Sequence, residues 1–147
     1  MRIAIIADTH GKLPDSVVAD IRLADEIWHL GDFVDQGILS ALQRIGPPVL
    51  GVLGNGDVGL DLPVTLRIER AGKSFFLIHA PPARPAGADF LLHGHTHVPR
   101  DEQVGGTRVL NPGTIGKPNH GAPPSYAWLE IDEVAGDVEW SLVRIGE

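Results

Sequence analysis

The sequence of 147 residues contains no cysteine. This excludes a disulfide framework and a catalytic or metal-binding thiolate, and it agrees with a reducing compartment such as the cytosol. Long apolar runs are also missing, because only five consecutive apolar residues separate Arg2 from Asp8. A run of this length is too short for the core of a signal peptide or for a membrane span. We therefore expect a cytoplasmic protein that has no membrane partner.

Positive charge is scarce as well. Twelve Lys and Arg residues stand against 19 Asp and Glu, which gives a net charge of −7, and the basic residues form no run or stripe. This argues against a nucleic-acid-binding surface. The hydrophobic content of 43% is ordinary for a soluble globular protein, and the length predicts a single domain over residues 1–147. The sequence has no internal repeat, low-complexity tract or linker.

Residue types that bind metals follow five short apolar runs. Each run has the length and flanks of a buried strand, and in open α/β sheets ligands collect at the carboxyl ends of the strands. Carboxylate and amide oxygens mixed with imidazoles, without thiolates, suit divalent ions such as Mn, Fe, Mg or Zn. Seven donors are too many for one ion, so two ions are predicted. The seven residues are Asp8, His10, Asp32, Asn55, His79, His95 and His97.

The sequence blocks around these residues resemble, in their order, those of the calcineurin-like metallophosphoesterase superfamily. The resemblance extends from Met1 to about Lys117. The small size and the segment 110–114 are similar to the compact bacterial and archaeal phosphodiesterase branch, to which a eukaryotic retromer scaffold subunit is related. The blocks are Asp8-Thr9-His10, Gly31-Asp32-Phe33-Val34-Asp35, Gly54-Asn55-Gly56-Asp57, His79 and Gly94-His95-Thr96-His97.

The expected fold is a four-layer αββα sandwich, in which two mixed β-sheets are flanked by helices. In the first third of the chain, strands alternate with a helix that opens at Pro14 and a helix over residues 34–45, which implies a parallel sheet. The remainder consists mainly of strands with short turns, which favours antiparallel pairing. These later strands are predicted at residues 64–70, 73–79, 88–93, 108–111, 126–131 and 138–144.

The segment from His79 to Gly87 contains three prolines, so it is not expected to form a regular helix. Many relatives in the superfamily have a helix at this place. The rim of the cleft is therefore expected to be more open on this side.

The resemblance also implies which residues bind which ion. A water or hydroxide between two such ions loses its proton near neutral pH and attacks phosphorus in line. We expect Mn²⁺, with Fe, Ni, Zn or Mg as alternatives, and we assign Asp32 and Asn55 to catalysis as well. One ion would be bound by Asp8, His10, Asp32 and His97, and the other by Asp32, Asn55, His79 and His95, with Asp32 bridging.

Gly56 departs from the pattern of the superfamily. Relatives with strong monoesterase activity commonly have His after the ligand Asn, as a candidate acid for the leaving oxygen. The absence of this histidine favours phosphodiesters over simple monoesters as substrates. His120, in a loop rich in Gly and Pro after Asn111-Pro112-Gly113, is predicted to supply part of the missing acid, and the alternative is a solvent-exposed loop histidine.

The predicted function is that of a dinuclear metal-dependent phosphodiesterase acting on a small phosphodiester or nucleotide substrate. Two alternatives remain open at this point. One is a nucleotide phosphomonoesterase, and the other is a protein-binding scaffold with a vestigial metal site. Members of this branch often form dimers, so a homodimer is among the expected states.

Several further residues receive structural roles. The histidines inside apolar runs are expected in the core, and the remaining acids of the blocks are expected to orient ligands or cap loops. The tryptophans are expected to pack in the core or between the sheets. These residues are His29 and His93, Asp35 and Asp57, and Trp28, Trp128 and Trp140.

Overall fold

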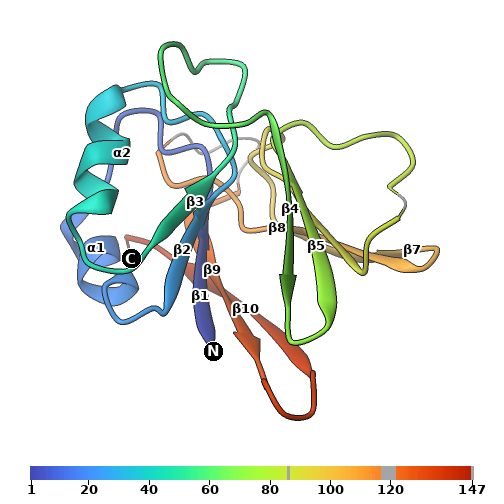
Figure 1. Ribbon diagram of the computed structural model, residues 1–147. Helices are drawn as coiled ribbons and strands as arrows, with labels where there is room; N and C mark the ends of the chain where they lie inside the picture. The colour runs from blue at the N-terminus through green and yellow to red at the C-terminus, as the bar shows by residue number, and fades with distance from the viewer. Residues whose placement is uncertain (86, 117–121, 147) are drawn as a thin grey trace.

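The computed structural model describes residues 1–85, 87–116 and 122–146. These residues form two five-stranded sheets and two helices (Figure 1). The first sheet consists of β1 (Arg2–Ile6), β2 (Glu26–His29), β3 (Val49–Gly51), β9 (Ser125–Ile131) and β10 (Val138–Arg144), and the second of β4 (Thr65–Arg70), β5 (Lys73–Ile78), β6 (Phe90–Leu92), β7 (Arg100–Val104) and β8 (Thr107–Asn111). The predicted class, an α/β sandwich of two mixed sheets, is confirmed.

The first sheet has the order β10-β9-β1-β2-β3. Strands β1, β2 and β3 are parallel, as predicted, and β9 and β10 add an antiparallel pair next to β1. The parallel strands are joined through α1 (Asp15–Ile21) and α2 (Gln36–Gln43), which lie on one side of this sheet (Figure 1). Each helix buries residues one turn apart against the sheet, Val17 and Ile21 in α1 and Ile38 and Leu42 in α2.

Helix α2 begins later than predicted. Asp35 is its N-cap, and its side chain accepts a hydrogen bond of 2.8 Å from the backbone N–H of Gly37. Val34 therefore lies outside the helix, with a φ of 68° and 52% of its surface exposed. The predicted start of this helix at residue 34 is wrong, because the Asp35 cap sets its start at Gln36.

The second sheet has the order β4-β5-β6-β8-β7. Its outer pairs β4–β5 and β7–β8 are antiparallel hairpins, whereas β5, β6 and β8 run parallel. Strand β7 was not predicted. Its sequence, Arg-Asp-Glu-Gln-Val, is largely polar and lacks an apolar face because it forms an exposed edge of the sheet.

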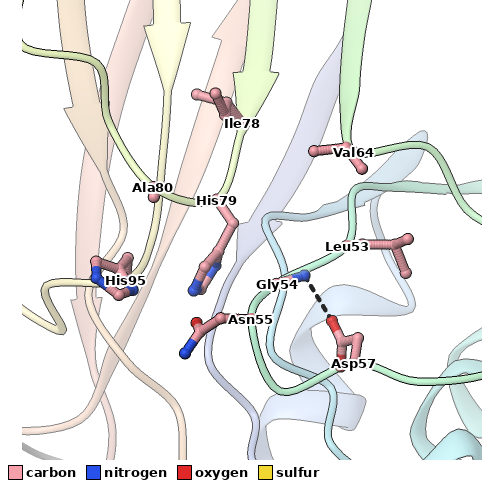
Figure 2. Close-up of a pocket in the computed structure, with 9 residues that line it drawn as sticks. All are labelled: Leu53, Gly54, Asn55, Asp57, Val64, Ile78, His79, Ala80 and His95. Carbon is pink, nitrogen blue, oxygen red and sulfur yellow. Dashed lines mark hydrogen bonds between the residues drawn. The ribbon is translucent and has the colours of Figure 1, made fainter.

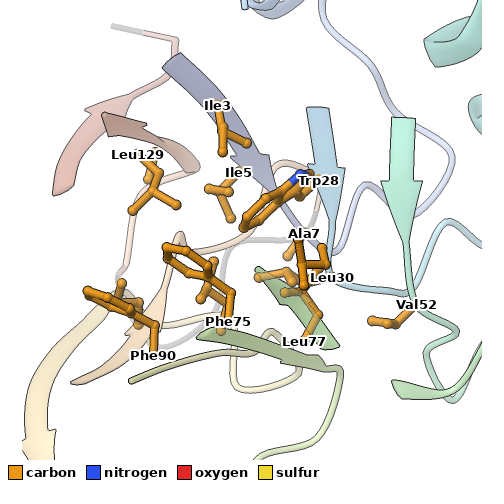
Figure 3. Close-up of a cluster of buried hydrophobic side chains, with 14 of the residues drawn as sticks. Ile3, Ile5, Ala7, Trp28, Leu30, Val52, Phe75, Leu77, Phe90 and Leu129 are labelled. Atoms are coloured by element: carbon orange, nitrogen blue, oxygen red, sulfur yellow. The ribbon is translucent and has the colours of Figure 1, made fainter. Parts of the chain in front are cut away.

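A hydrophobic core fills the space between the two sheets (Figure 3). Trp28 of the first sheet meets Phe75 of the second edge to face, with ring centroids 5.5 Å apart. Phe75 in turn stacks on Phe90 at 4.8 Å. Trp128 is buried in a second cluster between the first sheet and the helices, and Trp140 packs against the inter-sheet core. All three tryptophans therefore have the packing roles predicted for them.

The outer side of the second sheet is covered differently from that of the first. Both described helices lie on the first sheet, and the connection from β5 to β6 runs over the side of the second sheet that faces away from it (Figure 1). In the described part of this connection there is no helix, as its prolines predict. Neither α1 nor α2 has the length and apolar character needed to cross a membrane.

Candidate metal centre

The carboxyl ends of β1, β2, β3, β5 and β6 bring the seven predicted ligands to one place. His97 Nε2 lies 3.4 Å from Asp8 Oδ1, and His79 Nε2 lies 3.4 Å from Asp32 Oδ2. His10 Nε2 lies between the two carboxylates, 3.8 Å from Asp8 Oδ1 and 3.7 Å from Asp32 Oδ2. Because metal bonds of about 2.1 Å keep the donors of one ion within about 4.2 Å of each other, this spacing fits bound cations.

The donors form two overlapping groups that share Asp8. One contains Asp8, His10 and His97, and the other Asp8, Asp32 and His79. Asp32 Oδ2 lies within 4 Å of the imidazoles of both His10 and His79, at 3.7 and 3.4 Å. This central position of a carboxylate between two sets of imidazoles suits a pair of ions, because a shared anion reduces the repulsion between them.

The backbone is unusual where these residues lie. Among the described residues, seven other than glycine have a positive φ, and five of these seven are predicted ligands. Residues with side chains rarely adopt this region, and clusters of such conformations mark functional sites. The loops are therefore shaped to present donors rather than to minimise local strain. The five ligands are Asp8 (53°), His10 (48°), Asp32 (63°), His95 (72°) and His97 (64°).

Gly54 permits the closest approach of two of these loops. A Cβ at this position would lie 2.2 Å from Asp32 Oδ1 and 2.3 Å from the backbone nitrogen of Asp32. Any side chain there would displace Asp32, so the glycine before Asn55 is required by the packing of the site.

Asp8 is fully buried, and only one of its carboxylate oxygens is satisfied. Oδ2 accepts a hydrogen bond of 3.2 Å from the backbone N–H of His95, whereas Oδ1 has no hydrogen-bond partner. Burial, together with the negative charge of Asp32, raises the pKa of Asp8 to about 8. A divalent cation beside Oδ1 would offset both the burial of the carboxylate and its repulsion by Asp32, so the electrostatics of the site favour a bound cation.

His79 and Asn55 are oriented as ligands would be. His79 Nδ1 donates to the carbonyl of Leu30 at 2.8 Å, which leaves the lone pair of Nε2 directed at the carboxylates. The Asn55 amide oxygen lies 3.0 Å from His79 Nε2 and 3.3 Å from both carboxylate oxygens of Asp32, so it faces acceptors only. The opposite orientation of the amide would let its NH₂ group donate to these atoms, but a cation among them requires the oxygen.

Asp57 fixes the loops from outside the cluster. Its Oδ2 accepts from the backbone N–H groups of Asp32 and Gly54, and its Oδ1 accepts from that of Val34. Asp57 thus holds the loop after β2 against the loop after β3. This is the orienting role predicted for it.

The two core histidines are neutral and hold neighbouring loops in place. Burial lowers the pKa of His29 well below its ordinary value and that of His93 to about 4. His29 Nδ1 accepts from the backbone N–H of Gly31, so Nε2 carries the proton that is donated to Thr9 Oγ1 at 3.1 Å. His93 Nδ1 donates to the carbonyl of Gly94. Both histidines are buried, as predicted.

Asn111 connects β8 to the loop that carries His95 and His97. Its Nδ2 donates to the carbonyl of Gly94 and to Thr96 Oγ1, and its Oδ1 accepts from the backbone N–H of Gly113. Residues 111–113 therefore lie at the site and support its geometry.

Two of the predicted site residues need separate mention. The His95 ring packs edge to face on His79 with centroids 5.2 Å apart, and its backbone binds Asp8, but its ring is not part of either donor group. His120 lies outside the described residues.

Residues not recognised from the sequence also shape the site. Thr114 Oγ1 donates to the carbonyl of Asp8 at 3.1 Å, and an open pocket of about 360 Å³ adjoins Asn55 and His79 (Figure 2). Thr114 belongs to the segment 110–114 noted in the sequence, but its bond to Asp8 was not predicted, and no motif marks the pocket. The described residues that line the pocket are Leu53, Gly54, Asn55, Asp57, Val64, Ile78, His79, Ala80 and His95.

Comparison with known proteins identifies the family of the chain. Residues 1–134 match the model of the calcineurin-like phosphoesterase superfamily domain, so the chain belongs to this superfamily. It is 31% identical to a probable metallophosphoesterase of Methanothermobacter thermautotrophicus over 99% of this chain and 94% of that protein. It is 32% identical to the phosphodiesterase YfcE of Escherichia coli over 65% of this chain and 59% of that protein.

Solved structures have the same fold. A structure of YfcE, described as a phosphoesterase from E. coli, superposes with a TM-score of 0.79 at 24% identity and covers 99% of this chain and 100% of that chain. Wild-type Vps29 from Entamoeba histolytica, solved with zinc, gives a TM-score of 0.78 at 22% identity, with 98% and 99% covered. These two likenesses concern the fold. The family implies divalent metal ions, and the Asp and His groups provide candidate ligands for them.

Proposed function

We propose that the protein is a phosphodiesterase that depends on two divalent cations held by Asp8, His10, Asp32, Asn55, His79, His95 and His97. The observation that carries the proposal is the buried Asp8 carboxylate, whose Oδ1 has no hydrogen-bond partner and faces His10, His79 and His97. Mn²⁺ is the metal we propose, because the donors are oxygens and imidazole nitrogens. The Vps29 structure, which was solved as a complex with zinc, supports a divalent ion on this fold.

The proposed ligands would bind the two ions in two sets. Asp8, with His10 and His97, would hold one ion, and Asn55, His79 and His95 the other, with Asp32 shared between them. When bound, such ions act as Lewis acids that polarise a phosphoryl oxygen and lower the pKa of water. Asp57 and His29 would keep the carboxylate loops in register through the hydrogen bonds described above.

Preference for diesters is proposed from the residue after Asn55. Gly56 has no side chain, so the described loop offers no acid there for the leaving oxygen. A substrate whose leaving group needs little protonation would be least affected, and the resemblance to the phosphodiesterase YfcE supports this direction. A cytoplasmic location and a small diester substrate complete the proposal.

The test begins with metal content and turnover. Protein stripped with a chelator and reloaded with Mn²⁺ should bind about two ions and hydrolyse bis(p-nitrophenyl) phosphate faster than p-nitrophenyl phosphate. Asp32→Ala should lose both ions and the activity, because it is the shared ligand. Asp61→Asn, which removes a charge at an exposed position, is the matched control and should keep both.

The outcomes separate the alternatives. Faster monoester than diester hydrolysis would favour a phosphomonoesterase. No turnover of either substrate by fully loaded protein would favour a binding scaffold. Full metal content in Asp32→Ala would show that the assignment of the shared ligand is wrong.

A further inference from the structure

The pocket beside the metal centre has apolar walls on one side and donor residues on the other. Val64 precedes β4 and Ile78 ends β5, and these neighbouring strands place both residues next to His79 (Figure 2). Leu53 and Ala80 complete the apolar part. The volume of about 360 Å³ lies within the range of sites for small organic groups.

The charges around the pocket limit what it can hold. None of the described residues that line it is Lys or Arg, so none of these residues would neutralise an additional phosphate. Its carboxylate, Asp57, already accepts hydrogen bonds from three backbone N–H groups. The pocket therefore suits an uncharged group.

The apolar side chains are incompletely covered in the protein alone. Val64 has 64% of its surface exposed, and Ile78 and Leu53 are half-buried. An apolar group in the pocket would remove this surface from water, which is favourable in proportion to the area buried. The same group would be joined to a phosphorus atom beside Asn55 and His79, which lie at the end of the pocket nearest to Asp32.

We propose that this pocket binds an apolar ester group of the substrate, about the size of an aromatic ring, while the phosphoryl group lies at the centre formed by Asp8 and Asp32. The proposal rests on the phosphoesterase function proposed above and specifies its substrate class. Substrates with a ring-sized apolar ester group are bound better than methyl esters or esters that carry a further phosphate.

Binding of two phosphonates tests this without turnover. Protein loaded with Zn²⁺, which is diamagnetic, should bind phenylphosphonate about tenfold more tightly or better than methylphosphonate, because only the ring fills the pocket. In methyl NMR spectra, phenylphosphonate should shift the signals of Leu53, Val64 and Ile78. Ala80→Leu should abolish the preference by filling the pocket, whereas Ala83→Leu, an exposed position in the same connection, should keep it.

A third probe separates the pocket from the metal centre. Phenol added to the metal-free protein should shift the methyl signals of Val64 and Ile78. If phenol shifts these signals while neither phosphonate binds the metal-loaded protein, the apolar pocket is supported and the proposed phosphoesterase function is contradicted. Equal affinity for both phosphonates, or a ring preference that survives Ala80→Leu, would overturn the pocket proposal while leaving the metal centre intact. No shift from phenol and no phosphonate binding would overturn both.

Discussion

Replacement of Asp8 by Asn should remove the ion that Asp8 would hold with His10 and His97, and at the same time it should stabilise the metal-free protein. Asn has nearly the same size as Asp and tolerates the positive φ of 53° at this position. It cannot carry the negative charge that is buried near Asp32, where Oδ1 has no hydrogen-bond partner. A carboxylate that would bind the cation is therefore a source of instability when the cation is absent.

The size of the effect follows from the protonation of Asp8. Its pKa rises from 3.8 to about 8, and each tenfold change in a protonation equilibrium corresponds to about 1.4 kcal/mol. At a pH above both values the ionised carboxylate therefore costs on the order of 6 kcal/mol. Because the folded state holds the proton more tightly than the unfolded chain, the metal-free protein loses stability as the pH rises from about 4 to about 8, and the loss then levels off.

Urea unfolding of chelator-treated protein at pH 5, 7 and 9 measures this effect. Asp8→Asn should exceed the wild type in free energy of unfolding at pH 9, and the difference should shrink at pH 5. Asp61→Asn, at an exposed position, should show no such pH-dependent gain. The reasoning is refuted if metal-free Asp8→Asn is no more stable than the wild type at pH 9, or if it still binds two ions.

Three further substitutions test other parts of the structure. Glu26→Gln should lower the free energy of unfolding by about 1 to 3 kcal/mol in urea titrations. Glu26 of β2 accepts two hydrogen bonds, of 2.8 and 2.9 Å, from Arg70 of the other sheet. The control Glu130→Gln, in an exposed ion pair, should lower it by less than about 1 kcal/mol. Gly54→Ala should lower Mn²⁺ affinity at least tenfold by calorimetry because its Cβ would collide with a ligand carboxylate, whereas Gly106→Ala, with open space around it, should not. Gly56→His should raise monoester turnover about tenfold or more in a p-nitrophenyl phosphate assay, because the imidazole can protonate the leaving oxygen. The side chain fits, since the φ of Gly56 is not positive and a Cβ there meets nothing closer than 3.3 Å. Unchanged turnover would argue against the idea that Gly56 leaves the site without this acid.

Much of the fold could be predicted because its strands are strongly patterned. The apolar runs before Asp8 and Asp32 alternate with amphipathic helices, which is typical of parallel strands. Strand β7 has no such pattern, because an edge strand gains its stability from backbone pairing with β8 rather than from a buried face. The parallel pairing of β5, β6 and β8 likewise depends on a crossover whose path the sequence does not encode locally.

The composition of the site could be predicted, but its energetics could not. The residue types at the strand ends identify the donors, because carboxylates and imidazoles that recur at one strand end after another are typical of a metal site. The raised pKa of Asp8 depends on burial by segments far apart in the chain, and the orientation of His79 depends on the carbonyl of Leu30, 49 residues away. The apolar pocket was missed because Val64 and Ile78 have the same character as ordinary strand residues.

The energetic cost of the site bears on whether it is a working centre or a remnant. Five predicted ligands adopt a backbone conformation that disfavours residues with side chains, by on the order of 1 kcal/mol or more each. To this is added the charge of Asp8, buried near Asp32. A scaffold that required only the two sheets would be more stable with glycine or asparagine at these positions. Bound cations offset the repulsion between the carboxylates, and strained loops hold the donors in place for them. The unfavourable energy of the metal-free arrangement therefore supports a metal centre in use.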